Sequence, residues 1–516
     1  MSTNQPAPRA AAPDARRLRA VLISVSVALM AVVASVSGLN VAQTHVAVEF
    51  GASLGTVLWI VNVYPLTLAA LLLPLGAVGD RLGRKPVLVA GLVLFGVANV
   101  VAALAPTAGV VIAARVAAGV GAAMIMPVTL AVITSTFPED RRAKAIGVWT
   151  GVAGGGGVLG MFLSALLVDV ADWRWLFALP VALVVVALVT TARSVPNSRE
   201  RSAHPFDAVG ALLSTVAVVG LVFVLQEAPE RGWGAATAAG LVVGVAAGIA
   251  FVLWELRRGD AALLDVRLFR ERGLAGGSLT LLVVFGVQAG IGVVLFPFFQ
   301  AVLGWSGLVS TAALMPMAIS MMMASGLAAT LAARIGSRAT MATGVAVAGA
   351  GLVLMGLFVS VQGGYLSILP GLLAMGLGMG LSMTPSTEAI TGSLPRAQQG
   401  VASALNDITR EFGTALGVAL LGALVAAGYR AGIDGRLTGV PPQAADVARE
   451  GVAQATEVTG SFAPAVAQAA RESFVDGWQQ AMWVGAAVMV VLFAYVVLRG
   501  PKSPERSTVD EPVAVG

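Results

Sequence analysis

Apolar runs long enough to cross a lipid bilayer recur along almost the whole of this 516-residue chain. A spanning helix needs roughly 20 predominantly apolar residues, and inside a bilayer the backbone must satisfy its own hydrogen bonds, as an α-helix does. Splitting the sequence at charged and Gly/Pro-rich breaks predicts about fourteen spans, over residues 18–43, 54–78, 86–105, 107–133, 144–169, 174–194, 207–227, 234–256, 274–300, 307–332, 340–361, 365–390, 400–427 and 477–499. The sequence therefore predicts an all-α integral membrane protein.

The composition argues against several other classes of protein. With 57% hydrophobic and 11% charged residues, the chain could not cover a soluble domain with polar surface. It has no cysteine, and its two histidines, His45 and His204, lie far apart in the sequence. A metal site, a cofactor and an enzymatic activity are therefore not expected. The basic residues are dispersed in short clusters between apolar runs, which indicates orientation signals and no nucleic-acid partner.

Lys and Arg residues gather before the first predicted helix and after every second one. The clusters are Arg9, Arg16, Arg17 and Arg19; Arg81, Arg84 and Lys85; Arg141, Arg142 and Lys144; Arg193, Arg199 and Arg201; Arg257, Arg258, Arg267, Arg270 and Arg272; Arg334 and Arg338; Arg396; and Arg499, Lys502 and Arg506. Because basic loops stay on the cytoplasmic side, this alternation predicts a multi-pass protein of the cell (inner or plasma) membrane with both termini in the cytoplasm.

Two loops of similar sequence indicate an internal repeat. GDRLGRKPVLVAG at residues 79–91 aligns with AARIGSRATMATG at residues 332–344, and the shared positions are Arg81 with Arg334, Gly83 with Gly336, and Gly91 with Gly344. Chance similarity of two basic loops is the alternative. We expect two six-helix halves related as parallel repeats, at residues 20–200 and 261–500, an inserted helix pair at 201–260, and cytoplasmic tails at 1–19 and 501–516. The Ala/Gly/Gln-rich stretch 428–476 is either an outer-face hairpin or cap, or a flexible connector.

The loop GAVGDRLGRKP at residues 76–86 combines a small-residue helix end with one acid and three bases. Gly76 and Gly83 permit close helix approach and a tight reversal, and Asp80 can pair with a base. The segment resembles the signature loop of the major facilitator superfamily, and that resemblance implies a charge network that latches one conformation. The matching latch positions are Gly76, Asp80, Arg81, Gly83, Arg84 and Lys85. A loop that only orients the chain in the membrane is the alternative.

Four further stretches resemble one branch of that superfamily, the fourteen-helix drug:proton antiporters that include quaternary-ammonium and multidrug exporters. They are LWIVNVYPLTLAALLLPLGAVGDRLGRK, ARVAAGVGAAMIMPVTLAVI, DWRWLFALPVA and LLDVRLFRERGLAGG. The resemblance covers nearly the whole chain and implies proton-coupled efflux of drugs or antibiotics by alternating access around a site near the bilayer midplane. Arg115, in RVAAGVG, matches an arginine inside helix 4 of the superfamily. We expect it to serve proton handling or cavity charge, with snorkelling to the interface as the alternative.

The predicted fifth helix departs from the family pattern. GVAGGGGVLGMFLSALL keeps Gly160, but Met161 replaces the usual proline, and Ser164 and Ala165 replace a glycine pair. The glycine run 154–157 either supplies flexibility instead or packs helices tightly. Because this antiporter signature is degraded, proton-coupled or facilitated uptake stays open as an alternative function, and a non-transporting membrane sensor is another.

Three positions lack acids that the family often carries. Ser35 lies five residues before Asn40 on the first helix, and Asn62 and Met321 stand on helices where exporters of dications tend to have carboxylates. Each buried anion makes a large electrostatic contribution in a low-dielectric cavity. A neutral, monovalent or amphipathic substrate is therefore expected in place of a dication.

The stretch LNDITREFG at residues 405–413 places three charges in an otherwise apolar helix. By resemblance, Asp407 and Glu411 stand where multidrug exporters carry two acids, and their i,i+4 spacing puts both on one helix face. Arg410 can reach Asp407 at i,i+3, which leaves Glu411, near mid-membrane, as the better group to bind and release a proton. We expect proton coupling to involve Glu411, Asp407, Arg410 and Arg115. A structural ion pair at a hydrated helix end is the alternative.

Uncharged side chains that could line a drug cavity complete the prediction. They are Asn40, Asn62, Tyr64, Gln288, Phe296, Phe299, Gln300 and Met321. Aromatic and methionine side chains suit a yielding, polyspecific surface, and ordinary packing is the alternative for each of them. We expect a monomer whose partners are the lipid bilayer, protons and a hydrophobic or amphipathic small molecule.

Overall fold

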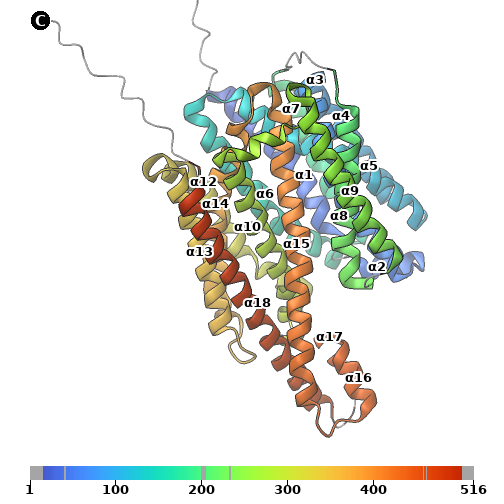
Figure 1. Cartoon of the computed structure of the whole chain (residues 1–516). Coiled ribbons are helices and arrows are strands. Elements are labelled where there is room, and N and C mark those ends of the chain that lie inside the picture. Colours follow the sequence, from blue (N-terminus) through green and yellow to red (C-terminus); the bar gives the residue numbers. More distant parts are fainter. Residues whose placement is uncertain are drawn as a thin grey trace, which may run out of the picture.

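The computed structural model describes residues 15–39, 42–198, 205–231, 234–456, 458, 460 and 462–501. Within these ranges all regular secondary structure is helical, and fourteen helical spans are long and apolar enough to cross a membrane. The helices stand side by side in one tall bundle (Figure 1). The predicted all-α membrane fold is thus confirmed.

The helices before the long central linker form the first part of the bundle. In chain order they are α1 (Ala15–Gly38), α2 (Gln43–Phe50), α3 (Leu54–Leu82), α4 (Arg84–Ala103), α5 (Ala108–Thr136), α6 (Glu139–Val170), the 3-10 turn η1 (Trp173–Phe177) and α7 (Ala178–Ser194). Short α2 and η1 lie together at one end of the bundle, where Glu49 forms an ion pair with Arg174 and accepts a hydrogen bond from Trp173. His45 is exposed on α2.

The remaining helices follow after the linker. They are α8 (Ala208–Arg231), α9 (Ala235–Arg258), α10 (Arg272–Pro297) with a π-turn η4 (Phe298–Val302), α11 (Gly307–Ala312), α12 (Met315–Ile335), α13 (Ser337–Phe358), α14 (Leu369–Ser393), α15 (Gln399–Ile433), α16 (Pro442–Glu450), α17 (Val452–Ala455) and α18 (Ala463–Arg499). We name the end of the bundle that carries the α3–α4, α5–α6 and α12–α13 turns the basic end. The other end, which carries α2, α16 and α17, is the opposite end (Figure 1).

The two loops that align in the sequence adopt the same backbone geometry. Gly83 between α3 and α4 has φ 109°, and Gly336 between α12 and α13 has φ 88°, a region that favours glycine. About two helical turns later, Gly91 and Gly344 each lie where an added Cβ would collide with a neighbouring helix. The shared residues thus serve the same two purposes, a tight reversal and a close helix contact.

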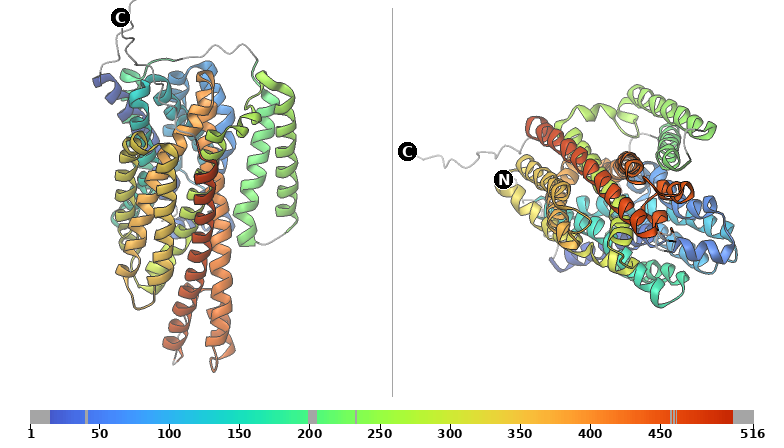
Figure 2. Two further views of the ribbon diagram at one scale, coloured as in Figure 1. Left: turned by 60° about the vertical axis from the view of Figure 1, so that its left-hand side comes forward. Right: turned by 90° about the horizontal axis from the view of Figure 1, so that it is seen from below.

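The helix pair α8 and α9 stands at one side of the bundle (Figure 2, left). Val218 and Val222 of α8 pack on Leu66 and Ala69 of α3, and the Thr215 hydroxyl donates to the carbonyl oxygen of Ala70 at 3.2 Å. α8 also contacts α15, whereas α9 packs mainly on α8. The pair therefore covers the line along which α3 and α15 meet.

The stretch 428–476 is largely helical. α15 continues to Ile433 and α18 already begins at Ala463, so both helices extend beyond the expected bounds 400–427 and 477–499. Arg436 joins them, with Nη2 2.8 Å from Asp476 Oδ2, and the Tyr429 hydroxyl ties α15 to α16 through the carbonyl oxygen of Ala448 at 2.5 Å. Of the two alternatives, the structure thus describes a helical hairpin with a cap.

We call α1–α7 the first half of the bundle and α10–α18 the second half; two backbone contacts join them near the basic end. A Cβ added to Gly76 of α3 would lie 2.6 Å from the carbonyl oxygen of Gly400 in α15, and one on Gly147 of α6 would lie 2.6 Å from that of Ser325 in α12. Next to the second contact, the Thr150 and Thr384 hydroxyls are hydrogen-bonded at 2.8 Å. Helices from opposite halves therefore touch backbone to backbone, and the structure is closed at its basic end.

A seam of glycines joins α10 to α15. A Cβ on Gly417 would lie 1.8 Å from the carbonyl oxygen of Gly286, and a Cβ on Gly413 would lie 2.3 Å from that of Leu282. Small residues at such a seam allow helices in a membrane to approach closely and gain van der Waals contact. Because no side chain separates the two backbones, the position of α15 along α10 is tightly defined.

We predict that Gly417→Val destabilises the protein, because its side chain would overlap the α10 backbone. Overpacking of this kind costs about 1–3 kcal/mol or more. The matched control is Gly326→Val, since a Cβ at Gly326 of α12 meets nothing within 4 Å. Thermal unfolding of the detergent-purified variants measures the difference, and equal transition temperatures for the two would contradict the prediction.

Candidate functional site

A cavity of about 920 Å³ lies between the two halves, bordered by α6, α10, α11, α12, α14 and α15. Four neutral polar side chains reach its wall, namely Gln288, Gln300, Thr311 and Thr414. The rest of its lining consists of glycine and apolar side chains, and none of the described lining residues carries a charge. The cavity can therefore hold an apolar or aromatic molecule and offer it a few hydrogen bonds.

Three of the side chains predicted to line a cavity do so: Gln288, Phe296 and Gln300. Phe299 is fully buried behind the wall, where its ring stacks on Trp305 with centroids 5.6 Å apart. Met321 is buried as well and fills the space against Gly154, which itself lines the cavity.

The predicted cavity residues of the first three helices lie elsewhere. The Tyr64 hydroxyl donates to the carbonyl oxygen of Val32 at 3.1 Å, so this side chain belongs to the packing between α3 and α1. Asn62 is half-buried on α3 and does not reach the cavity wall. Asn40 lies outside the described residues.

Arg115 is buried inside α5 and is held by neutral groups. Its Nη1 donates to the hydroxyl and the carbonyl oxygen of Ser35, both at 3.2 Å, and its Nε donates to the carbonyl oxygen of Ile60 at 3.3 Å. The guanidinium carbon lies 4.3 Å from the centroid of the Tyr64 ring, a cation–π contact. Ser35, which stands where the family often has an acid, thus binds this cation without neutralising it.

The charges on α15 form a buried cluster two turns into the helix. Arg410 Nη1 lies 3.5 Å from Asp407 Oδ1, and the Asn406 amide donates to the same oxygen at 3.1 Å. Asp407 is 0% exposed and Arg410 6%. The guanidinium carbon of Arg410 lies 4.4 Å from the centroid of Phe285 on α10 and 5.7 Å from that of Trp149 on α6. Two aromatic rings and one carboxylate therefore share this cation.

The polar atoms of this cluster are only partly satisfied. Asp407 Oδ2, Asn406 Oδ1, and Nε and Nη1 of Arg410 are buried without a hydrogen-bond partner among the described residues. Buried polar groups normally find partners, and an unsatisfied one is costly. The cluster thus has the capacity to accept a proton on Asp407 or to rearrange around Arg410.

Glu411 lies one turn from the cavity wall. It is half-buried and shares a helix face with Asp407 and with Thr414, which lines the cavity. Its carboxylate makes no hydrogen bond and no ion pair with another described residue, although Arg410 and Tyr64 lie within electrostatic reach. Of the acids on this helix, Glu411 is therefore the one free of a direct partner and next to the cavity.

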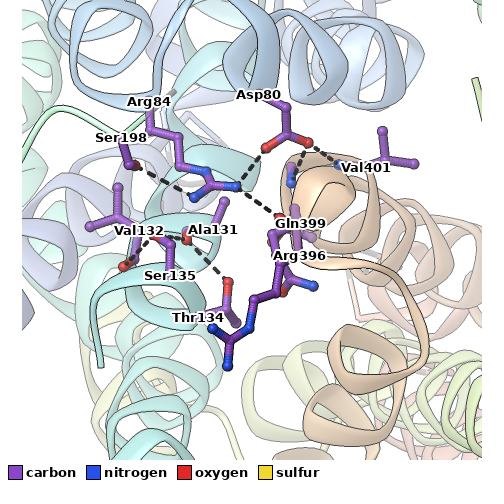
Figure 3. A network of polar contacts seen from close by, with 12 residues as sticks. Asp80, Arg84, Ala131, Val132, Thr134, Ser135, Ser198, Arg396, Gln399 and Val401 are labelled. Carbon is purple, nitrogen blue, oxygen red and sulfur yellow. Dashed lines mark hydrogen bonds and ion pairs between the residues drawn. The ribbon is translucent and has the colours of Figure 1, made fainter. Parts of the chain in front are cut away.

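Asp80 joins the two halves at the basic end. Its Oδ1 accepts from Arg84 Nη2 at 2.9 Å, and its Oδ2 accepts from the backbone amides of Gly400 at 2.7 Å and Val401 at 3.3 Å (Figure 3). These amides belong to the first turn of α15, where backbone N–H groups lack helical partners and the helix dipole favours a negative charge. One carboxylate thus binds its own loop and the start of the helix that carries the buried charges.

The other residues of the predicted latch make contacts in the same corner of the bundle. Arg84 also approaches Ser198 Oγ and the carbonyl oxygen of Arg396, each at 3.5 Å (Figure 3). Arg81 donates to the carbonyl oxygen of Pro205 at 3.0 Å, and Lys85 to that of Ala192 at 2.8 Å. Arg84 therefore reaches across to the second half, whereas the contact of Lys85 stays within the first.

Phe285 and Trp149 were not predicted as site residues. Their signal in the sequence is faint, because single aromatic side chains in apolar helices usually only pack. Trp149 does lie in the same helix as the glycine run 154–157. Thr414, which lines the cavity, lies seven residues after Asp407, and that spacing predicts that it shares the polar, cavity-facing side of this helix.

Comparison with known proteins assigns the chain to a family of membrane transporters, in agreement with its fold. Residues 23–418 match the family model of the Major Facilitator Superfamily, and the chain belongs to this family of membrane transporters. It is 34% identical to the multidrug efflux pump LfrA of Mycolicibacterium smegmatis, over 88% of this chain and 89% of that one.

Two further proteins extend the comparison. The chain is 30% identical to the methyl viologen resistance protein SmvA of Salmonella typhimurium, over 92% of this chain and 95% of that one. The proton:xylose symporter XylE shares the fold, with a TM-score of 0.61, 15% identity, and coverage of 95% of this chain and 97% of that one. The expected family resemblance is confirmed.

We predict that Asp80→Asn opens the basic end. The substitution removes the charge that binds both Arg84 and the α15 amides, and charge-assisted hydrogen bonds contribute about 1.5–3 kcal/mol each. The chain lacks cysteine, so spin labels at Asp140→Cys and Arg396→Cys report the separation of the halves directly. The label distance should lengthen with Asp80→Asn and stay constant with Lys85→Ala, and an unchanged distribution for Asp80→Asn would refute a latch role.

Proposed function

We propose that this protein exports hydrophobic or amphipathic compounds, including drugs, in exchange for protons by alternating access. The observation that carries the proposal is the neutral cavity between the halves, with a buried acid–base cluster directly beside its wall. The relatives support the same function, because LfrA is named a multidrug efflux pump. The neutral polar and apolar side chains of the cavity wall suit the binding and release of such a compound.

The uncharged wall favours a particular class of substrate. A dication in such a cavity would lose most of its hydration and find no lining carboxylate, and an unpaired charge in a low-dielectric site is costly. A neutral compound, or a monovalent one with most of its surface apolar, loses less and gains dispersion contact with Phe296 and the surrounding side chains. We therefore propose that this chain favours substrates of lower charge than methyl viologen, the dication in the name of SmvA.

The orientation of the chain identifies the side of the membrane on which the described conformation is closed. We assign the basic end to the cytoplasm, because its loops carry the Lys and Arg clusters. The conformation in the structure is then the one closed toward the cytoplasm by Asp80 and by the Gly76–Gly400 contact. Rocking of the halves would break these contacts and admit substrate from the cytoplasm or the inner leaflet. A monomer contains every element that this cycle requires.

Glu411 is the group that we assign to the proton. It lies one turn from the cavity wall and makes no direct contact with another described charged group, whereas Asp407 is already paired with Arg410. Protonation of Glu411 neutralises the charge nearest the cavity, and deprotonation restores it when substrate is bound. Arg115 would contribute a fixed positive charge to the first half, since neutral groups hold it and no described carboxylate pairs with it.

We predict that Glu411→Gln abolishes proton-driven export, because glutamine keeps the shape of the side chain and cannot bind or release a proton. Ethidium, an aromatic monovalent cation, serves as the transported probe in inside-out vesicles energised with an imposed pH gradient. The control is Glu472→Gln, which removes a half-buried acid that pairs with Arg436 in the hairpin. Full activity of Glu411→Gln would remove this residue from the mechanism, and ethidium moving with the proton gradient instead of against it would indicate uptake.

We predict resistance to amphipathic compounds and little resistance to dications. In cells lacking their own exporters, the wild-type chain should raise the inhibitory concentration of ethidium and of tetraphenylphosphonium severalfold more than that of methyl viologen, because the cavity lacks lining carboxylates. Cells carrying Glu411→Gln give the baseline. Stronger protection against methyl viologen than against either monovalent compound would refute the proposed substrate class.

A further inference from the structure

Phe285 touches both the substrate cavity and the buried charges. It lines the cavity wall on α10, and its ring centroid lies 4.4 Å from the guanidinium carbon of Arg410. Phe296, the other aromatic side chain in the described lining, has no described cation over its ring. A molecule in the cavity can therefore reach Arg410 through a single side chain.

Arg410 is poised between two kinds of partner. On one side are the rings of Phe285 and Trp149, and on the other is Asp407 at 3.5 Å, a distance that leaves Nε and Nη1 without hydrogen bonds. A cation held by ring faces gains the π contact but leaves its N–H groups unpaired. A small shift toward the carboxylates would exchange one set of contacts for the other.

The backbones of α10 and α15 cannot move relative to each other in response to a molecule in the cavity. Gly286 and Gly417 are in direct backbone contact, and Gly413 lies against Leu282 of α10. Sliding or rotating one helix on the other would break this seam along its length. The seam fixes the two backbones, but the side chains of Phe285 and Arg410 can still move.

We propose that Phe285 is a positioning residue that couples occupancy of the cavity to proton release from α15. This inference rests on the proposed function. An aromatic substrate that packs against Phe285 competes with Arg410 for contact with the ring. The cation–π contact then weakens, and Arg410 moves toward Asp407 and Glu411. A cation closer to a carboxyl group favours the ionised form. The proton bound to Glu411 or Asp407 therefore leaves as free H⁺, and the carboxylate that remains is paired with Arg410.

The charged surroundings of Arg410 are few. On α15 itself they are Asp407 and Glu411. Across the interface, α3 presents Tyr64, behind which lies Arg115 of α5, while α10 and α6 present only the rings of Phe285 and Trp149. A shift of Arg410 therefore acts mainly on the two acids of its own helix.

The test measures protons released per ethidium bound by the purified full-length protein in weakly buffered detergent solution, with a pH-indicating dye. Phe285→Leu and Phe285→Met both remove the ring and keep an apolar side chain of similar size, while Phe285→Tyr restores the ring. Phe296→Leu is the matched control, because it removes an aromatic side chain from the same wall without touching Arg410. Fluorescence anisotropy of ethidium gives the affinity in parallel.

We expect Phe285→Leu and Phe285→Met to release less than about half as many protons per bound ethidium as the wild type, since Arg410 already rests on the acids in the empty cavity. Phe285→Tyr should keep the wild-type ratio. Phe296→Leu should weaken ethidium binding by roughly fivefold, the effect of losing one aromatic contact, and leave the ratio unchanged.

The possible outcomes separate this inference from the proposed function. A wild-type ratio in both ring-removing variants overturns the role of Phe285 and leaves proton-coupled export intact. An equal loss of the ratio in Phe296→Leu also overturns it, because the effect would then belong to the cavity wall as a whole. A wild-type protein that binds ethidium without releasing protons contradicts the proposed function itself.

Discussion

The carboxylate of Asp80 accepts hydrogen bonds from the first amides of α15, and this contact joins the α3–α4 loop to the helix that carries the buried charges. α15 is common to every functional feature: it begins at this contact, carries Asp407, Arg410 and Glu411 two to three turns later, and lines the cavity at Thr414. Since an α-helix rises about 1.5 Å per residue, all of these features fall within roughly 22 Å of one rigid element. Closure at the basic end and the state of the acids are thereby linked in one helix.

The second constraint is the scarcity of carboxylates inside the membrane. Arg115 and Arg410 are both buried, yet only Arg410 has an acid within ion-pair distance among the described residues. Aromatic rings and carbonyl oxygens complete their surroundings. A cation held in this way costs less to bury than a bare charge and stays able to change partner. The same scarcity leaves the described cavity wall neutral, so the proposed substrate class and the proposed proton site rest on one property of the chain.

Much of the protein could be predicted without its structure, because the bilayer acts locally on the chain. The length of each apolar run and the positions of Lys and Arg depend on neighbouring residues only, and they indicated fourteen spans and a basic end. The charges of the 405–413 stretch and the latch loop were found for the same reason, since charge in an apolar helix is conspicuous. The length of the hairpin was less predictable, because α15 and α18 continue past the apolar runs where α16 and paired charges support them.

The sequence by itself thus determined the class of fold and the small set of buried charges that any mechanism must use. Which helix faces meet was decided only by packing. Asp80 could be expected to meet a base, but its amide partners belong to α15, more than 300 residues later. Phe299 and Tyr64 were as plausible in the cavity as Phe296, yet the rotation of their helices buries them elsewhere. The physical reason is that hydropathy is a property of one segment, whereas a cavity wall is formed by several helices whose rotations depend on contacts such as the Gly286–Gly417 seam.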